Sequence, residues 1–119
     1  MEHSKEFLEL AEAAQSRVKE ISVEEAREKV ESGAALIDVR EDNEFAAGHA
    51  VDAKHIGRGV IERDIIGAFP DKNAELILYC GGGYRSALAA DNLQKMGYTN
   101  VLSMIGGFAA WTDAGAPTE

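Results

Sequence analysis

The segment from residue 75 to residue 97 constrains the fold of this chain more than any other part of the sequence. Residues 75–80 read ELILYC, an apolar run with the length and composition of a buried strand. Three consecutive glycines follow, and residues 86–96 then place apolar side chains at helical spacing before Gly97. A buried strand that passes through a glycine turn into a helix is the repeating unit of a parallel sheet covered by helices.

Strand-like and helix-like segments alternate along the rest of the chain. Short apolar runs predict further strands at residues 35–39, 53–56 and 100–104. Apolar periodicity predicts helices at residues 3–20 and 22–33, the second with a capping box at its start. Residues 40–47 are polar and compatible with a helix that ends at Gly48, a short helix is expected at 106–111, and a helical turn or loop at 58–67. The alternation predicts an α/β fold with a mainly parallel sheet of about five strands and helices on both faces.

The chain has 119 residues, which is the usual size of one domain. We assign residues 1–19 to an N-terminal helical extension and residues 20–119 to the domain itself. The amphipathic pattern of the extension is typical of a helix that packs on its own domain, and a partner-binding helix is the alternative.

Charge and hydropathy restrict the partners and the compartment. The formal net charge is −9, so bulk repulsion argues against nucleic acid or an anionic membrane as the main partner. The chain has no apolar run long enough to span a bilayer and no secretory signal at its start, so we expect a cytoplasmic, reducing location. Because Cys80 is the only cysteine, it is either a buried apolar residue or a reactive thiol.

The position of Cys80 favours the reactive thiol. It stands where a buried strand ends, at the sheet edge where parallel α/β proteins bind ligands. Glycines at positions 81–83 let the backbone curl with its N–H groups turned inward, and the following helix adds its positive N-terminal end. This nest, with Arg85 as a nearby cation, favours a thiolate or another anion on the sulfur. The alternative is a buried cysteine beside an ordinary glycine turn.

The loop from Cys80 to Arg85 resembles the active-site loop of rhodanese-domain sulfurtransferases. Two further segments resemble motifs of the same family. The first comprises residues 36–41 with Glu44-Phe45 and Gly48-His49; the second comprises Gly106-Gly107-Phe108, Trp111, Gly115 and Pro117. The resemblance extends over residues 20–117 and implies a single-domain, rhodanese-like sulfurtransferase. One departure is the segment after His49, which reads AVDA where the family usually has an Ile-Pro-Gly-Ala turn.

The resemblance also implies roles for individual residues. Cys80 would be the nucleophile that carries sulfur as a persulfide, and Asp38 with Arg40 would brace the site from the neighbouring strand. For that pair, a surface or helix-capping ion pair is an equal alternative. The cradle for the substrate would comprise Gly81, Gly82, Gly83, Tyr84 and Arg85, with Ser86 in a supporting position.

Two arginines outside these motifs could supply positive charge for an anionic donor. Arg58 and Arg63 are candidates for the mouth of the site, and the alternative for them is a solvated face paired with nearby acids. With one cysteine and histidines scattered at positions 3, 49 and 55, no metal-ligand spacing is present. We therefore expect neither a metal nor an organic cofactor, and we interpret His49 as structural.

The reaction that the resemblance implies is a two-step sulfur transfer. A small anionic donor such as thiosulfate or a persulfide would load Cys80, and an external thiol, a thiol protein or cyanide would take the sulfur. Two alternatives remain: a non-catalytic rhodanese-like binding or regulatory module, and a cysteine phosphatase or arsenate reductase. The second is disfavoured because only four residues separate Cys80 from Arg85, a tight loop for a tetrahedral oxyanion.

Overall fold

The computed structural model describes residues 3–119, and within them it contains one five-stranded sheet. The strands are β1 (Lys19–Ile21), β2 (Ala35–Asp38), β3 (Lys54–His55), β4 (Leu76–Tyr79) and β5 (Val101–Met104). Every neighbouring pair is parallel, in the order β1-β5-β4-β2-β3. The predicted α/β fold with a mainly parallel sheet is confirmed.

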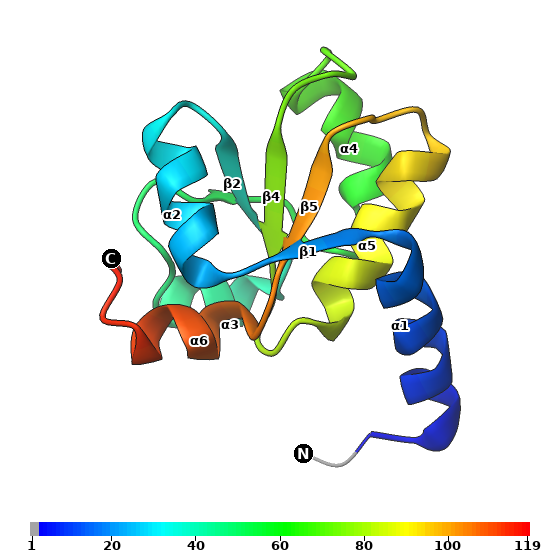
Figure 1. Cartoon of the computed structure of the whole chain (residues 1–119), viewed down its shortest axis with the longest axis horizontal. Coiled ribbons are helices and arrows are strands. Elements are labelled where there is room, and N and C mark those ends of the chain that lie inside the picture. The colour runs from blue at the N-terminus through cyan, green and yellow to red at the C-terminus, as the bar shows by residue number, and fades with distance from the viewer. Residues whose placement is uncertain (1–2) are drawn as a thin grey trace.

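Helices cover both faces of this sheet, as predicted (Figure 1). The helices are α1 (Lys5–Arg17), α2 (Val23–Glu31), α3 (Asp42–Ala47), α4 (Ile61–Ala68), α5 (Tyr84–Lys95) and α6 (Gly107–Asp113). Side chains alternate along β4, so Leu76 and Leu78 pack toward α4 and α5, whereas Ile77 and Tyr79 pack toward α2 and α6. Because both faces of β4 are covered, the strand is apolar throughout.

Two segments differ from the sequence-based prediction. The helix expected over residues 3–20 ends at Arg17, and residues 19–21 instead form β1 at the edge of the sheet, paired with β5. The segment expected as a helical turn or loop at 58–67 contains a regular helix, α4, which buries Ile61 and Ile65 against the core. The local sequence favours neither conformation strongly in these two segments. Pairing with β5 therefore determines the conformation of residues 19–21, and burial against the core determines that of α4.

The sheet order places a crevice beside the end of β4. The chain leaves β2 toward β3 on one side, and it leaves β4 through α5 toward β5 on the other side. Neighbouring strands whose connections diverge in this way open a crevice at their carboxyl ends. Cys80 follows β4 directly, and Arg40 follows β2 after one residue, so both lie at this edge.

The altered segment after His49 still forms a turn. Ala53 N–H donates to the Ala50 carbonyl over 3.1 Å, and Asp52 adopts φ 67°. Aspartate tolerates this left-handed conformation better than most residues, so it can replace the glycine of the family pattern. Val51 N–H donates to the Pro117 carbonyl over 3.1 Å, a bond that proline could not make at this position.

Candidate active site around Cys80

The Cys80 sulfur is held by the loop that follows β4. The residue is only 1% exposed, and the Gly83 N–H donates to Sγ over 3.0 Å. Gly83 adopts φ 108°, which favours glycine and turns its N–H back toward the sulfur at the start of α5. The thiol in turn donates to Ser86 Oγ over 3.5 Å. The loop therefore supplies a backbone donor to the sulfur at the start of a helix, where negative charge is favoured.

Ser86 is the supporting residue named from the sequence, and it lies beneath the sulfur. Its Oγ lies 2.8 Å from Ser103 Oγ and donates to the Gly83 carbonyl over 3.3 Å. Ser86 and Ser103 are both completely buried. Ser103 lies on β5 and was not singled out in the sequence, because a buried serine within a strand has no distinguishing pattern.

The start of α6 fixes the other side of the loop. Phe108 N–H donates to the Cys80 carbonyl over 2.6 Å, and Ala109 N–H donates to the Gly81 carbonyl over 3.2 Å. Gly107 has φ 55°, and a Cβ there would overlap the Cys80 carbonyl oxygen. The absence of a side chain at Gly107 therefore allows α6 to approach the loop closely.

Arg85 is engaged by a carboxylate that sequence reasoning had not assigned to the site. Its two terminal nitrogens donate to the two oxygens of Glu44 over 2.7 and 3.1 Å. The hydrogen bond from Arg85 lowers the Glu44 pKa to about 2, and the same bond raises the Arg85 pKa. Glu44 belongs to α3, which follows β2, so this pair bridges the crevice between the two strand ends.

Asp38 and Arg40 form a buried ion pair, so the surface interpretation of this pair is wrong. Asp38 is completely buried and Arg40 is 6% exposed. The guanidinium donates to both Asp38 oxygens over 2.8–3.1 Å and to the Gly48 carbonyl over 2.7 Å, and its Cζ lies 4.3 Å from the centre of the Phe108 ring. The pair thus connects β2, the segment after α3 and the start of α6.

A cavity of about 550 Å³ opens above the sulfur. Its lining comprises His3, Phe7, Glu44, Arg58, Cys80, Gly82, Tyr84 and Arg85. Arg58, a candidate from the sequence, is part of this lining. Arg63 is not part of this lining, and it pairs with Asp64 over 2.7 Å on the exposed surface. Sequence analysis did not connect His3 or Phe7 with the site, since they lie far from Cys80 along the chain.

Histidines and acids are not gathered into a metal centre in the part of the chain that the structure describes. The rings of His49 and His55 instead stack with the Phe45 ring, at centroid distances of 3.7 and 4.6 Å. Of the helices described, none is long and apolar enough to cross a membrane.

Comparison with known proteins agrees with this geometry. The model of the rhodanese-like domain family matches residues 22–114, so the chain belongs to that family. A relative named thiosulfate sulfurtransferase GlpE, from Haemophilus influenzae, is 34% identical over 102 residues, which are 85% of this chain and 94% of that protein. A GlpE of Pseudomonas aeruginosa is 35% identical over 91 residues, 76% of this chain and 81% of its own length.

Solved structures show the same fold. A protein of unknown function from Rhodopseudomonas palustris, described as a possible tyrosine phosphatase, has a TM-score of 0.85 and 28% identity, covering 100% of this chain and 98% of its own. A thiosulfate sulfurtransferase from Pseudomonas aeruginosa has a TM-score of 0.77 and 26% identity, covering 85% of this chain and 20% of its own.

Proposed function

We propose that this chain, a sulfurtransferase of the rhodanese type, moves a sulfur atom from thiosulfate or a persulfide to an external acceptor through a persulfide on Cys80. The observation that carries the proposal is the Gly83 N–H donating to the Cys80 sulfur at the base of a cavity. The named relatives support thiosulfate as the donor.

The chemistry proceeds in two displacements. The Cys80 thiolate attacks the outer sulfur of thiosulfate; the new S–S bond forms as the bond to the sulfonate group breaks, and sulfite leaves with the electron pair. A thiolate or cyanide then attacks the terminal sulfur, and Cys80 leaves as a thiolate. The fixed Gly83 N–H and the start of α5 stabilise negative charge in both steps without rearrangement.

The acceptor must come from outside the chain, since no second cysteine can take the sulfur internally. A small thiol or a protein thiol in a reducing, cytoplasmic setting meets this requirement. At the mouth, Arg58 supplies positive charge for the anionic donor, and Arg85 retains guanidinium N–H groups beyond the two that bind Glu44.

Intact-mass measurement after incubation with thiosulfate tests the proposal. The protein should gain about 32 Da, one sulfur atom, and cyanide should remove it, as a covalent intermediate requires. Cys80→Ser should gain nothing. A gain of the same mass by Cys80→Ser would contradict the assignment, and no gain by the wild type would favour a binding module.

Hydrolysis of a phosphate ester is a second candidate, because the R. palustris structure is described as a possible tyrosine phosphatase. Four residues separate Cys80 from Arg85, which leaves a tight loop better matched to one sulfur than to a phosphate. Hydrolysis of p-nitrophenyl phosphate that is lost in Cys80→Ser would support this second activity.

A further inference from the structure

The N-terminal helix α1 contributes a wall to the cavity above Cys80. Figure 1 shows the amino-terminal end of α1 extending past the start of α5, on the side where the loop after β4 lies. Phe7 of α1 and His3, which precedes α1, both line the cavity, together with Tyr84, the first residue of α5. The two residues lie outside the segment 22–114 that matches the family model.

Three aromatic rings contact one another in this wall. The His3 ring centroid lies 5.0 Å from that of Phe7 and 5.3 Å from that of Tyr84, and the Phe7 and Tyr84 centroids are 6.0 Å apart. Both contacts with Tyr84 are edge-to-face, a favourable geometry for aromatic pairs. Aromatic side chains from the N-terminal segment, comprising His3 and α1, and from the start of α5 therefore form one continuous surface.

Contacts with α5 hold this wall in place. Ala11 and Ala14 are completely buried, and Phe7 packs beside Ala87 and Leu88 of α5. At the other end of α1, Arg17 donates to both oxygens of Asp91 over 2.7–3.2 Å. These contacts hold α1, and with it Phe7, against α5.

The size of the cavity exceeds what an inorganic anion requires. A volume of about 550 Å³ lies within the range of sites that bind organic molecules, whereas thiosulfate has five heavy atoms. The lining includes both aromatic carbon, from Phe7 and Tyr84, and the cation of Arg58. Such a lining fits a compound with an anionic sulfur group attached to an apolar body.

We propose that His3 and Phe7 are specificity-determining residues, which favour sulfur donors that carry an apolar or aromatic body over inorganic thiosulfate. The proposal rests on the sulfur transfer proposed above. With an aromatic thiosulfonate, the Cys80 thiolate attacks the terminal thio sulfur. The S–S bond to Cys80 forms, the bond to the sulfonyl sulfur breaks, and the sulfinate leaves with the electron pair.

Single-turnover loading of Cys80 with benzenethiosulfonate and with thiosulfate tests this inference. Phe7→Ala and His3→Ala should each lower the loading rate constant for benzenethiosulfonate, with about a tenfold loss for Phe7→Ala, and should change that for thiosulfate less than about twofold. Leu10→Ala is the matched control, because Leu10 lies on the same helix but is 55% exposed and outside the cavity lining. It should load with both donors as the wild type does.

The outcomes separate this inference from the proposed function. Failure of the wild type to load with either donor overturns the sulfur transfer itself. Normal loading with thiosulfate, but equal effects of Phe7→Ala on both donors, overturns the specificity role and makes α1 a support for the loop. His3→Ala keeps the test valid if Phe7→Ala loosens α1, because His3 is exposed and belongs to no buried cluster among the described residues.

Discussion

Glu44 neutralises part of the positive charge of Arg85 at the cavity. Its carboxylate binds the guanidinium through two hydrogen bonds, and the side chains of both residues are about one-third exposed at the cavity. Because the bond from Arg85 holds the Glu44 pKa at about 2, against an ordinary value of 4.5, the carboxylate stays ionised throughout the neutral range. The pair forms fully above about pH 4.5 and is lost as the pH falls toward 2.

Removal of this negative charge should make loading by thiosulfate faster. In Glu44→Gln, the amide binds Arg85 more weakly, so the guanidinium can bind the donor's sulfonate group with charge-assisted hydrogen bonds. We expect the second-order rate constant for loading to rise by about threefold to tenfold at pH 7 and low salt, and the gain to shrink as salt is added.

Asp42→Asn is the matched control, since it removes the same charge from the same helix at a fully exposed position. Its loading rate constant should stay within about twofold of the wild-type value, because screening weakens exposed charges. A slower Glu44→Gln enzyme would show instead that Glu44 is needed to orient Arg85.

At the scale of elements, the first turn of α6 holds the cysteine loop in position through backbone hydrogen bonds. Two N–H groups in its first turn bind the carbonyls of Cys80 and Gly81, and Trp111 anchors the helix in the core on that face of the sheet. Trp111 Nε1 donates to the Pro117 carbonyl over 2.8 Å, so the C-terminal segment is tied to the same helix. The position of the loop therefore depends on residues that never touch the sulfur.

Gly107→Ala should destabilise the protein through this contact. The new Cβ would overlap the carbonyl of Cys80, and alanine is strained at φ 55°. We expect a loss of at least about 2 kcal/mol in the free energy of unfolding, from overpacking and backbone strain together. Urea unfolding followed by tryptophan fluorescence measures this loss.

Gly67→Ala is the companion variant, because Gly67 lies in α4 with no atom near the position of the new Cβ. It should stabilise the protein by up to about 1 kcal/mol, as expected for a helical glycine replaced by alanine. Equal stability of the two variants would mean that the loop moves freely to admit a side chain at position 107.

Local sequence patterns predicted the strand and the helix that flank Cys80. The segment from β4 through Cys80 to α5 contains an apolar run, three glycines and apolar residues at helical spacing, and these patterns predict a strand, a turn and a helix. The edge strand β1 was not predicted, since Lys19 and Glu20 carry no apolar pattern and their conformation comes from pairing with β5. Pairing across the sheet is a tertiary effect that no local window contains.

The same distinction holds for the candidate site. Cys80 and its glycines follow one another in sequence, so their proximity could be predicted without knowing the fold. Glu44 and Phe7 reach the site only because α3 follows the neighbouring strand and α1 packs on α5. Phe7 is an apolar residue on an amphipathic helix, which sequence alone does not distinguish from a packing residue. Glu44 belongs to the first motif, but an acid on a short polar helix does not by itself indicate a partner such as Arg85.

For the whole molecule, the attachment of α1 connects stability with the shape of the cavity. Asp91 of α5 receives hydrogen bonds from the Arg17 side chain, and Lys95 lies 3.5 Å from the same carboxylate. Gln94 also donates to the Arg17 carbonyl over 3.0 Å. The Asp91 side chain is only 7% exposed, so these cations replace most of the water that the carboxylate loses on folding.

This ion pair predicts a pH-dependent role for Asp91. The hydrogen bond from Arg17 holds the pKa of Asp91 below its ordinary value of 3.8. A carboxyl group with a lowered pKa contributes stability that is complete above the unfolded value, and that contribution is lost as the pH falls through the folded value. The contribution of Asp91 should therefore be constant from pH 7 to about pH 5 and should decline below about pH 4.

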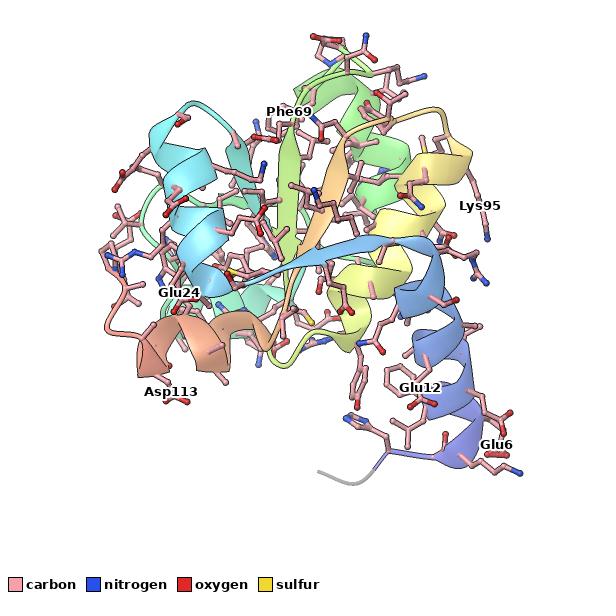
Figure 2. The ribbon with its side chains drawn as sticks, viewed as in Figure 1. Glu6, Glu12, Glu24, Phe69, Lys95 and Asp113 are labelled. Carbon is pink, nitrogen blue, oxygen red and sulfur yellow. The ribbon has the colours of Figure 1, made fainter. Side chains whose placement is uncertain are left out.

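Thermal unfolding of Asp91→Asn, measured from pH 7 to pH 3, tests this role. At pH 7 the variant should unfold several degrees below the wild type, because the amide offers Arg17 one acceptor oxygen in place of two and carries no negative charge. The difference in Tm should shrink as the pH falls below about 4, because Asp91 of the unfolded chain then takes up a proton that the folded carboxylate, with its lowered pKa, binds less readily. Asp113→Asn is the control: Figure 2 shows Asp113 on the outer side of α6, where it is exposed, and its substitution should leave Tm nearly unchanged. A Tm difference for Asp91→Asn that is the same at pH 3 and pH 7 would mean that side-chain packing, and not the ion pair, attaches α1 to the domain.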